Sequence, residues 1–259
     1  VVTDLGSAHP TWFDKRVERV YVPSEPLQKL ALRRGMAPEN VRLLGLPTRP
    51  AFWGDLGSSA VAAGVAADKV AARRRLGLAT DVPTALLVGG GDGFGRLRDI
   101  AVAVAGQLAD DLPKSQVVVV AGNNKKLQVQ LQELPWPAAD KVSVVIKGFV
   151  ANMDEWMAAA DVLVTKAGPG TIAEACTKGL PLVLSSYLPG QEKGNVALVT
   201  EGGFGVYQKR PRRIAATVSE WLRDPARLAA MGGKARREGR PTATLDIAKD
   251  IADGVLQLA

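Results

Sequence analysis

The hydrophobic residues of this chain fall into short apolar runs that are separated by segments with helical periodicity. Such near-continuous runs are typical of strands buried on both faces of a parallel sheet. Because helix-like segments alternate with these runs, the pattern predicts a doubly wound, Rossmann-like α/β domain, whose ligands bind beyond the carboxyl ends of the strands. The predicted strands are 85–88, 117–120, 142–146, 162–164, 182–184 and, more weakly, 205–207.

The N-terminal part of the chain carries a smaller set of elements. Alternating apolar residues predict a strand over 17–22, and a second strand is predicted over 41–44. Between them we expect a helix over 25–34, with Ser24 as its N-cap and Gly35 as its stop.

Two other segments lack the strand pattern. Residues 47–67 are rich in proline, glycine and alanine and form the best linker candidate, part of which has helical character. From Pro211 onward the chain reads mainly as helices, and Pro241 is expected to begin the last one, over 242–258.

The size and composition are those of a soluble globular protein. The 259 residues are 47% hydrophobic and 23% charged, which allows one or two domains with a sizeable core. No apolar run approaches the ~18 residues that a membrane span needs. The chain begins inside an apolar run and without an initiator methionine, so we expect it to be a fragment of a longer protein.

The net charge of +7 favours anionic partners such as a nucleotide or an anionic lipid surface. The alternative is that the clusters of basic residues are simply solvated faces and ends of helices. Nucleic acid is disfavoured because the aromatic residues are few and do not interleave with the basic runs. The single cysteine, Cys176, excludes an internal disulfide and is expected to be a buried structural thiol. The single histidine, His9, excludes a histidine-pair metal site.

The most informative motif is the glycine-rich turn at 165–174, which follows the apolar run 161–164. A turn of this kind before a helix lets the backbone approach a ligand, and the free amides and dipole of the helix favour a phosphate. Glu174 lies one turn inside that helix, where its carboxylate would accept hydrogen bonds from a ribose diol. The motif predicts a nucleotide or nucleotide-sugar site; the alternative is a structural turn fixed by Pro169.

Two further loops follow predicted strands. The loop Gly89–Gly95 resembles a phosphate-binding turn, but it does not match G-x-G-x-x-G, and no acid follows the next strand. A dinucleotide cofactor is therefore disfavoured, and a flexible turn is an equal alternative. The turn at 146–150 would offer backbone groups to a base while Phe149 supports it; the alternative is that Phe149 caps the core.

The remaining candidates are a polar loop and an N-terminal motif. Gln191 and Glu192, after another strand, would bind sugar hydroxyls, unless the loop is merely solvated. Asp4 would orient His9 as in an acid–base pair, although a lone histidine is more often structural. The chain has no Asp-x-Asp pair, so we expect helix N-termini rather than a metal ion to stabilise a leaving diphosphate.

Taken together, these loops resemble the monogalactosyldiacylglycerol synthase family of plastids. Relatives of that family include bacterial diacylglycerol glucosyltransferases and the N-acetylglucosaminyl transferase of lipid II synthesis. The resemblance covers almost the whole chain, and strings of this length in this order are quite specific to the galactolipid enzymes. The strings that carry it are 1–6, 9–13, 45–47 with 49–50, 165–175 and 189–195.

The resemblance implies a GT-B fold of two Rossmann-like domains. Residues 1–52 would be the C-terminal remnant of a truncated acceptor domain, and 53–259 the donor domain with its C-terminal helices. It implies transfer of galactose from UDP-galactose to diacylglycerol with inversion, with no metal and no other cofactor. Family members are peripheral proteins of the plastid (chloroplast) envelope membrane that respond to anionic lipids.

The resemblance also implies roles for individual residues. Uracil would meet Phe149 and Val150, the ribose would meet Glu174, and galactose would meet Gln191 and Glu192. The diphosphate would be cradled by Gly168, Pro169, Gly170 and Thr171 and lined by Gly91.

Two departures from the family pattern limit the resemblance. The family's general base is a histidine in a glycine-rich loop near its N-terminus, so the base is expected N-terminal to this chain and His9 keeps at most a supporting role. Asp92 stands where the family has glutamate; the carboxylate is kept, but the aspartate side chain is shorter than that of glutamate. Two alternatives stay open: a transferase of the same fold that uses glucose or N-acetylglucosamine on another lipid, and a catalytically incomplete UDP-binding fragment.

Overall fold

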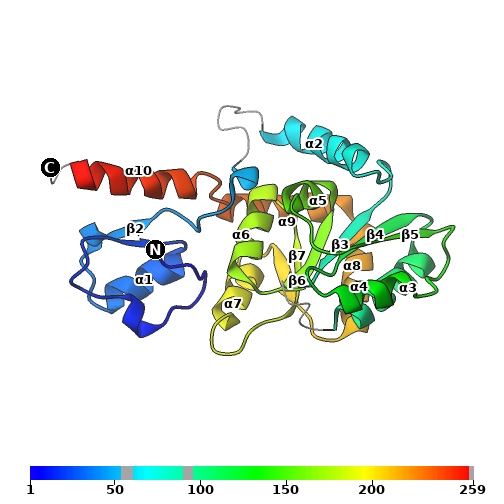
Figure 1. Cartoon of the computed structure of the whole chain (residues 1–259), viewed down its shortest axis with the longest axis horizontal. Helices are drawn as coiled ribbons and strands as arrows, with labels where there is room; N and C mark the ends of the chain where they lie inside the picture. Colours follow the sequence, from blue (N-terminus) through cyan, green and yellow to red (C-terminus); the bar gives the residue numbers. More distant parts are fainter. Residues whose placement is uncertain (54–60, 90–95, 257–259) are drawn as a thin grey trace.

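The computed structural model describes residues 1–53, 61–89 and 96–256, which form two units joined by the chain near residue 50. In Figure 1 the smaller, N-terminal unit lies at one end of the molecule and the large sheet with its helices at the other. None of the helices in the described ranges combines the length and the apolar character that a membrane span requires.

The small unit is a two-stranded parallel sheet with one crossover helix. Its strands are β1 (Val20–Val22) and β2 (Val41–Leu43), and α1 (Glu25–Arg33) packs on them. Short 3₁₀ turns η1 (Pro10–Trp12) and η2 (Pro38–Asn40) complete it, and a third, η3 (Pro50–Phe52), lies at the junction with the large unit. The predicted elements are confirmed, but each strand is shorter than predicted because the ladder pairs only the last three residues of 17–22 with the first three of 41–44.

The start of α1 differs from the prediction in one respect. Ser24 occupies the N-cap position, but its hydroxyl makes no cap hydrogen bond and donates instead to the carbonyl of Leu5. This bond ties α1 to the N-terminal loop. The helix ends as predicted, since Gly35 follows it with a φ of +84°, a conformation that glycine adopts without strain.

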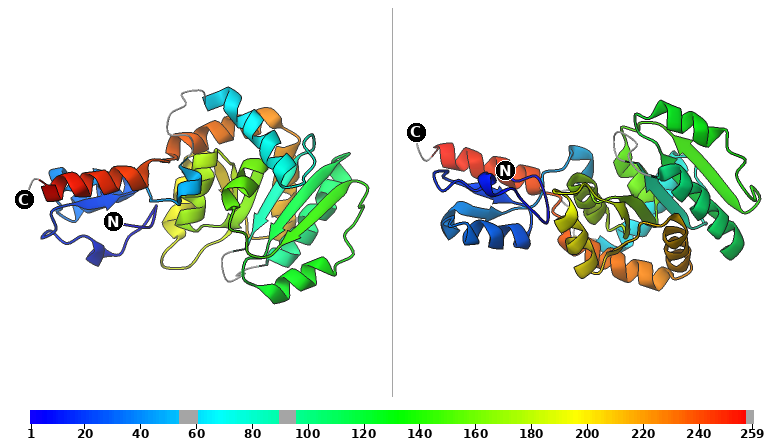
Figure 2. Two further views of the ribbon diagram at one scale, coloured as in Figure 1. Left: turned by 45° about the horizontal axis from the view of Figure 1, so that its top comes forward. Right: turned by 90° about the horizontal axis from the view of Figure 1, so that it is seen from below.

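The C-terminal helix α10 (Ala243–Leu256) returns to the small unit, and the two lie side by side in Figures 1 and 2. Asp250 of α10 accepts hydrogen bonds from Arg19 Nη1 at 3.0 Å and from Tyr21 Oη at 2.7 Å. Arg42 Nε lies 3.7 Å from the same carboxylate. The last helix of the chain is therefore part of the packing of the first fifty residues.

The large unit is a six-stranded sheet in the order β5-β4-β3-β6-β7-β8, and every neighbouring pair is parallel. This order confirms the predicted doubly wound α/β fold. The strands are β3 (Thr84–Val88), β4 (Ser115–Val120), β5 (Val142–Lys147), β6 (Val162–Lys166), β7 (Leu182–Ser186) and β8 (Gly205–Tyr207). The helices are α2 (Val61–Arg75), α3 (Leu97–Asp111), α4 (Lys125–Gln132), α5 (Met153–Ala159), α6 (Pro169–Lys178), α7 (Lys193–Glu201), α8 (Pro211–Leu222) and α9 (Pro225–Glu238).

Successive strand residues bury into opposite faces of this sheet, as the near-continuous apolar runs require. Ala85 and Leu87 of β3 face the core under α3 and α8, whereas Leu86 faces the core under α5 and α6. Val117 and Val118 of β4 divide in the same way. The apolar runs therefore reflect two separate cores.

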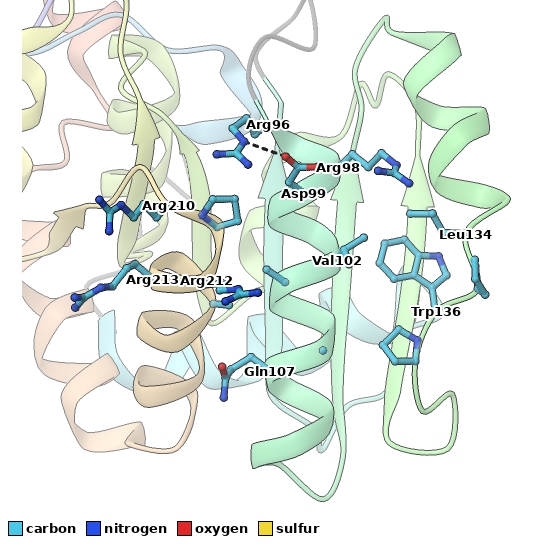
Figure 3. Close-up of a pocket in the computed structure, with 16 residues that line it drawn as sticks. Arg96, Arg98, Asp99, Val102, Gln107, Leu134, Trp136, Arg210, Arg212 and Arg213 are labelled. Atoms are coloured by element: carbon cyan, nitrogen blue, oxygen red, sulfur yellow. Dashed lines mark hydrogen bonds and ion pairs between the residues drawn. The ribbon is translucent and has the colours of Figure 1, made fainter.

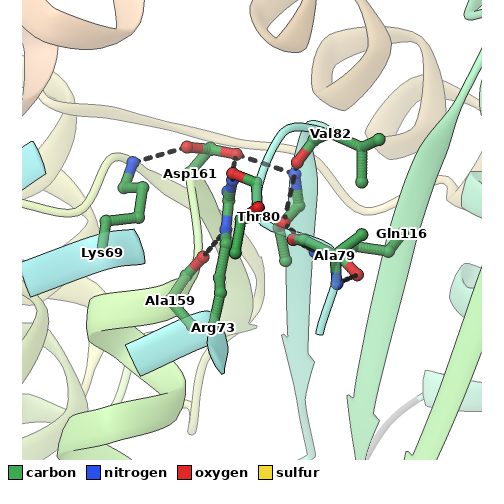
Figure 4. Close-up of polar contacts among 9 residues, drawn as sticks. Lys69, Arg73, Ala79, Thr80, Val82, Gln116, Ala159 and Asp161 are labelled. Atoms are coloured by element: carbon green, nitrogen blue, oxygen red, sulfur yellow. Dashed lines mark hydrogen bonds and ion pairs between the residues drawn. The ribbon is translucent and has the colours of Figure 1, made fainter. Parts of the chain in front are cut away.

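A partly buried ion cluster anchors α2 at the amino-end edge of the sheet (Figure 4). Asp161, just before β6, accepts hydrogen bonds from Arg73 Nη2 at 2.7 Å, Lys69 Nζ at 2.5 Å and the backbone amide of Thr84 at 2.7 Å. The Arg73 side chain is only 6% exposed and also donates to the carbonyl of Ala159. The cluster therefore joins α2, which begins inside the predicted linker 47–67, to the first residues of β3 and β6.

Candidate functional site

The order of the strands reverses between β3 and β6, and such a switch point is where doubly wound sheets bind ligands. The loop after β6 leads into α6, whose first residue is Pro169 and whose N-cap is Gly168. The amides of Gly170 and Thr171 lie in the first turn and therefore have no acceptor within the helix. The predicted glycine turn thus lies at the carboxyl edge of the sheet, with amides available to an anion.

The turn is shorter than predicted because β6 continues through Thr165 to Lys166, which pairs with Ser186 of β7 across a register shift. An ordinary side chain at Gly168 would meet Lys166 Nζ at 3.1 Å, whereas a side chain at Gly170 would meet nothing within 4 Å. A side chain at Gly168 would therefore need a small shift of the Lys166 amine, whereas position 170 faces open space.

Glu174 lies one turn inside α6, as predicted, and has a partner that sequence reasoning did not find. Its Oε1 accepts hydrogen bonds from Arg49 Nη2 at 2.9 Å and Nε at 3.1 Å, and its side chain is 13% exposed. Burial raises the pKa of Glu174 above its ordinary value, and the charge and hydrogen bonds of Arg49 lower it. The carboxylate is therefore partly desolvated next to the turn, where a ribose was predicted.

The loop between β7 and α7 is held against β6 by a buried glutamate. Glu192 is 5% exposed; one of its carboxylate oxygens pairs with Lys166 Nζ, and the other accepts the amide of Leu188 at 2.8 Å. Gln191, beside it, is exposed. A sugar contact by either residue stays a prediction, and Glu192 would make it while keeping these internal bonds, since each carboxylate oxygen has two acceptor sites.

Asn195 joins three of the predicted loops. The residue is fully buried; its Nδ2 donates to the carbonyl of Ala167 at 3.0 Å, and its Oδ1 accepts the amide of Gly6 at 2.8 Å. Gly6 and Gly194 pack backbone to backbone, because a Cβ on Gly6 would lie 2.0 Å from the carbonyl carbon of Gly194. The N-terminal loop is therefore packed against the loops that follow β6 and β7.

The predicted pairing of Asp4 with His9 is wrong. Asp4 is buried and accepts the amide of Leu5 at 2.8 Å, while His9 Nδ1 lies 2.7 Å from the hydroxyl of Thr11. The residues before Asp4 form no strand, so no strand end aims its carboxylate at His9. Burial, the largest influence, raises the pKa of Asp4, and Asn195 opposes it through a hydrogen bond.

The predicted base-binding turn lies at the same carboxyl edge, after the edge strand β5. Phe149 is 69% exposed, which rules out the alternative that it caps the core. Val150 is half-buried and packs against the core under α5 and α6. Since neighbouring strands lie ~4.8 Å apart, the ends of β5 and β6 are separated by ~14 Å, so an occupant that reached both would lie along this edge.

Other predicted features have simpler outcomes. Gly91 and Asp92 lie outside the described residues. Cys176 is buried, as predicted, and burial raises the pKa of its thiol, which makes it unreactive. Within the described ranges no three His, Cys, Asp or Glu side chains gather as they would around a metal ion, and metal-free chemistry stays a prediction.

A groove of about 1040 Å³ lies away from the glycine turn (Figure 3). Arginines from the beginnings of α3 and α8 line it, and Trp136 and Leu134 lie on the side of α3 away from α8. Of the arginines, Arg96 pairs with Asp99 at 2.9 Å. We call this surface the arginine groove; its arginines are Arg96, Arg98, Arg210, Arg212 and Arg213.

Comparison with known families identifies both units. The model for the glycosyltransferase family 28 C-terminal domain matches residues 84–251, and that for monogalactosyldiacylglycerol (MGDG) synthase matches residues 1–48. The chain is 41% identical over 261 residues to the chloroplastic monogalactosyldiacylglycerol synthase of Spinacia oleracea, covering 99% of this chain and 47% of that protein. The chain thus spans about half the length of the curated relatives that it matches, and the predicted resemblance is confirmed.

Solved structures share the fold at low sequence identity. The MurG of Acinetobacter baumannii superposes with a TM-score of 0.63 at 16% identity, covering 91% of this chain and 67% of that one. The UDP-GlcNAc 2-epimerase of Neisseria meningitidis, bound to UDP-GlcNAc, gives a TM-score of 0.65 at 14% identity, covering 91% of this chain and 61% of that one. These likenesses confirm the predicted fold class.

Proposed function

The chain belongs to glycosyltransferase family 28, and on that premise we propose that it forms the donor side of an enzyme that moves galactose from UDP-galactose to diacylglycerol. The product would be monogalactosyldiacylglycerol. The observation that carries the proposal is the glycine turn at the switch point, with Glu174 one turn inside α6. The similarity to the spinach enzyme, which runs through both units, supports the choice of sugar and acceptor.

In this proposal UDP lies along the carboxyl edge of the sheet. The first turn of α6 and Gly91 bind the diphosphate, Glu174 accepts the ribose hydroxyls, and the turn at 149–150 meets uracil. Gln191 and Glu192 hold the galactose. The span between the ends of β5 and β6 supports an extended nucleotide in this orientation.

The main catalytic contribution of these residues is to stabilise the leaving diphosphate. The acceptor hydroxyl attacks the anomeric carbon from the face opposite UDP; the new C–O bond forms as the bond to the diphosphate breaks, so the configuration inverts. Negative charge that develops on the diphosphate meets the amides and the positive dipole end of α6. We propose that these amides and the helix dipole take the place of a metal ion. We also propose that the base that accepts the proton from the acceptor hydroxyl lies outside residues 1–259.

The test of the sugar and acceptor is a comparison of donors. With diacylglycerol in mixed micelles, the full-length enzyme is expected to turn over UDP-galactose faster than UDP-glucose or UDP-N-acetylglucosamine, in kcat/KM. A preference for either other donor would replace the galactose assignment by a transferase of the same fold. Galactolipid formed by residues 1–259 alone would rule out a catalytically incomplete fragment.

We further propose that the enzyme works as a peripheral protein on an anionic membrane of the plastid envelope. The chloroplastic names of its relatives support the compartment. The arginine groove supports the surface: its five arginines carry positive charge beside the half-buried Trp136 and the exposed Val102, a combination suited to lipid headgroups (Figure 3).

Replacing both Arg212 and Arg213 by glutamine is expected to weaken binding to vesicles that contain 30% phosphatidylglycerol by about thirtyfold, since each basic residue near such a surface contributes about 1 kcal/mol. Binding of the unmodified protein should fall as salt rises. The control is Lys29→Gln with Arg33→Gln on α1, which removes the same charge elsewhere. Equal losses in the two double variants would mean that net charge, not the groove, binds the membrane.

A further inference from the structure

Arg49 joins the two units at the nucleotide site. It precedes η3, the short turn between the small unit and the donor domain, and both of its bonds to α6 end on one atom, Glu174 Oε1. Two N–H groups fill the acceptor sites of that oxygen. Oε2 of Glu174 has no hydrogen-bond partner among the described residues, so it is the oxygen left for a ligand.

The guanidinium is itself held in place. Arg49 lies over the ring of Phe52 at 5.3 Å from its centre, and Phe52 is fully buried. Lys178, at the end of α6, lies 5.6 Å from the centre of the same ring. A cation on a fixed aromatic ring loses little further freedom when it binds a carboxylate, which favours a single orientation of Glu174.

We propose that Arg49 is a positioning residue of the nucleotide site: it fixes and charges Glu174 through Oε1, so that Oε2 accepts the 2′- and 3′-hydroxyls of the ribose. The proposal rests on the proposed function, because it needs a ribose at Glu174. It assigns to Arg49 an action through another side chain rather than a contact with the nucleotide.

The charges around Glu174 explain why such a partner is needed. Burial, the largest influence, raises the pKa of Glu174, and Asp154 of α5 raises it further. Arg49 is the opposing cation, and it lowers the pKa through its charge and its hydrogen bonds. On α9, which packs on α6, Arg236 lies against Gly179 just beyond the end of α6, and the charge of Glu238 acts on Cys176, two residues after Glu174.

The protonation state matters because only the carboxylate accepts from both hydroxyls through Oε2. A carboxylic acid keeps a proton on one oxygen and loses acceptor capacity. Without Arg49, the pKa of Glu174 is higher, so the acid form appears at a higher pH. As the solution is acidified, a variant without Arg49 should therefore lose UDP affinity at a higher pH than the unmodified chain.

The test is the pH dependence of UDP affinity in the Arg49→Gln variant of the 259-residue chain, measured by calorimetry from pH 5 to pH 8. The ratio of its Kd to that of the unmodified chain is expected to be about tenfold greater at pH 5 than at pH 8. The titration of the nucleotide's own phosphates cancels in this ratio. Arg49→Lys keeps the positive charge but not the paired N–H groups of the guanidinium, and it should restore most of the pH profile.

The chain offers a matched control. Arg227 also pairs with a glutamate, Glu220 at 2.5 Å, and also lies over an aromatic ring, Trp221 at 5.9 Å, but on α8 and α9. Arg227→Gln should leave UDP affinity unchanged at every pH. A second check is Arg49→Gln combined with Glu174→Gln, whose loss should be no greater than that of Glu174→Gln alone.

The outcomes separate this inference from the proposed function. If the unmodified chain does not bind UDP, the proposed function fails. If the chain binds UDP but the ratio of the Arg49→Gln Kd to the unmodified Kd is the same at all pH values, the inference is wrong. It is also wrong if the losses of affinity in Arg49→Gln and Glu174→Gln add in the double variant. In either case Arg49 acts directly on the nucleotide or only on stability. A smaller Arg49 effect on 2′-deoxy-UDP than on UDP would support it.

Discussion

Replacing Glu174 by alanine is expected to weaken UDP binding about a hundredfold. A hydrogen bond to a charged group contributes about 1.5–3 kcal/mol, so two ribose hydroxyls on one carboxylate amount to about 3 kcal/mol, or a factor of about a hundred in Kd. The carboxylate is available for this because it lies one turn inside α6 and is only partly solvated, at 13% exposure. Calorimetric titration with UDP at pH 7.5 measures the effect.

Two variants make this result specific. Glu174→Gln keeps the shape of the side chain and should also weaken binding, because an amide has one oxygen and no charge. Glu220→Ala removes a glutamate that pairs with an arginine on the far helices and should leave the Kd unchanged. If Glu174→Ala binds UDP as tightly as the unmodified chain, the ribose is not at Glu174, and the orientation proposed for the nucleotide is wrong.

Replacing Asp161 by alanine is expected to lower the free energy of unfolding by about 3 kcal/mol. The change leaves Arg73, whose side chain is 6% exposed, without its carboxylate, and it leaves the amide of Thr84 without an acceptor. Breaking a buried pair by removing one partner costs several kcal/mol, because the remaining charge stays desolvated. For a chain of this size the melting temperature should fall by about 6–12 °C.

A double variant distinguishes a charge effect from a packing effect. In Asp161→Leu with Arg73→Met both charges of the Arg73–Asp161 pair are gone. Only Lys69, whose side chain is partly exposed, then loses its partner, so the loss should be smaller than that of Asp161→Ala. A double variant that is less stable than Asp161→Ala would show that the cluster's charges contribute stability beyond compensating each other. Since Figure 4 shows this cluster at the amino-end edge of the sheet, UDP affinity should not change in any variant that stays folded.

The strands of the large sheet were predictable because burial on both faces requires apolar residues at every position. The run 117–120 is valine throughout, and each residue fills one of the two cores. The glycine turn before α6 was predictable for a different reason. Its signal is local: a strand, a glycine–proline–glycine sequence and a helix start follow one another within ten residues, and no distant residue is needed to form it.

The partners of the site residues were not predictable in this way. Arg49 lies 125 positions before Glu174, and Asn195 binds an amide 189 positions away. Pairs of this kind depend on how the crossovers close, and neither periodicity nor turn chemistry carries that information. The error over Asp4 has the same origin, because its true neighbour is Asn195 rather than the nearby His9.

The arginine groove also comes from segments far apart in the sequence. Its arginines belong to two helix starts separated by more than a hundred positions, and each cluster alone resembles an ordinary solvated helix face. Only the packing of α3 against α8 brings them together. The sequence therefore predicted a positive surface without indicating where it lies.

The central claim is that the carboxyl edge of the sheet binds a uridine nucleotide, and the most direct measurement is a calorimetric titration of the 259-residue chain with UDP in the presence of EDTA. ADP and NAD serve as controls. The account predicts that UDP binds without a metal and that ADP and NAD bind at least tenfold more weakly, because the proposed orientation puts the base at the turn after β5, where these nucleotides would bring an adenine instead of uracil. Absence of UDP binding, or equal binding of UDP and ADP, would contradict it.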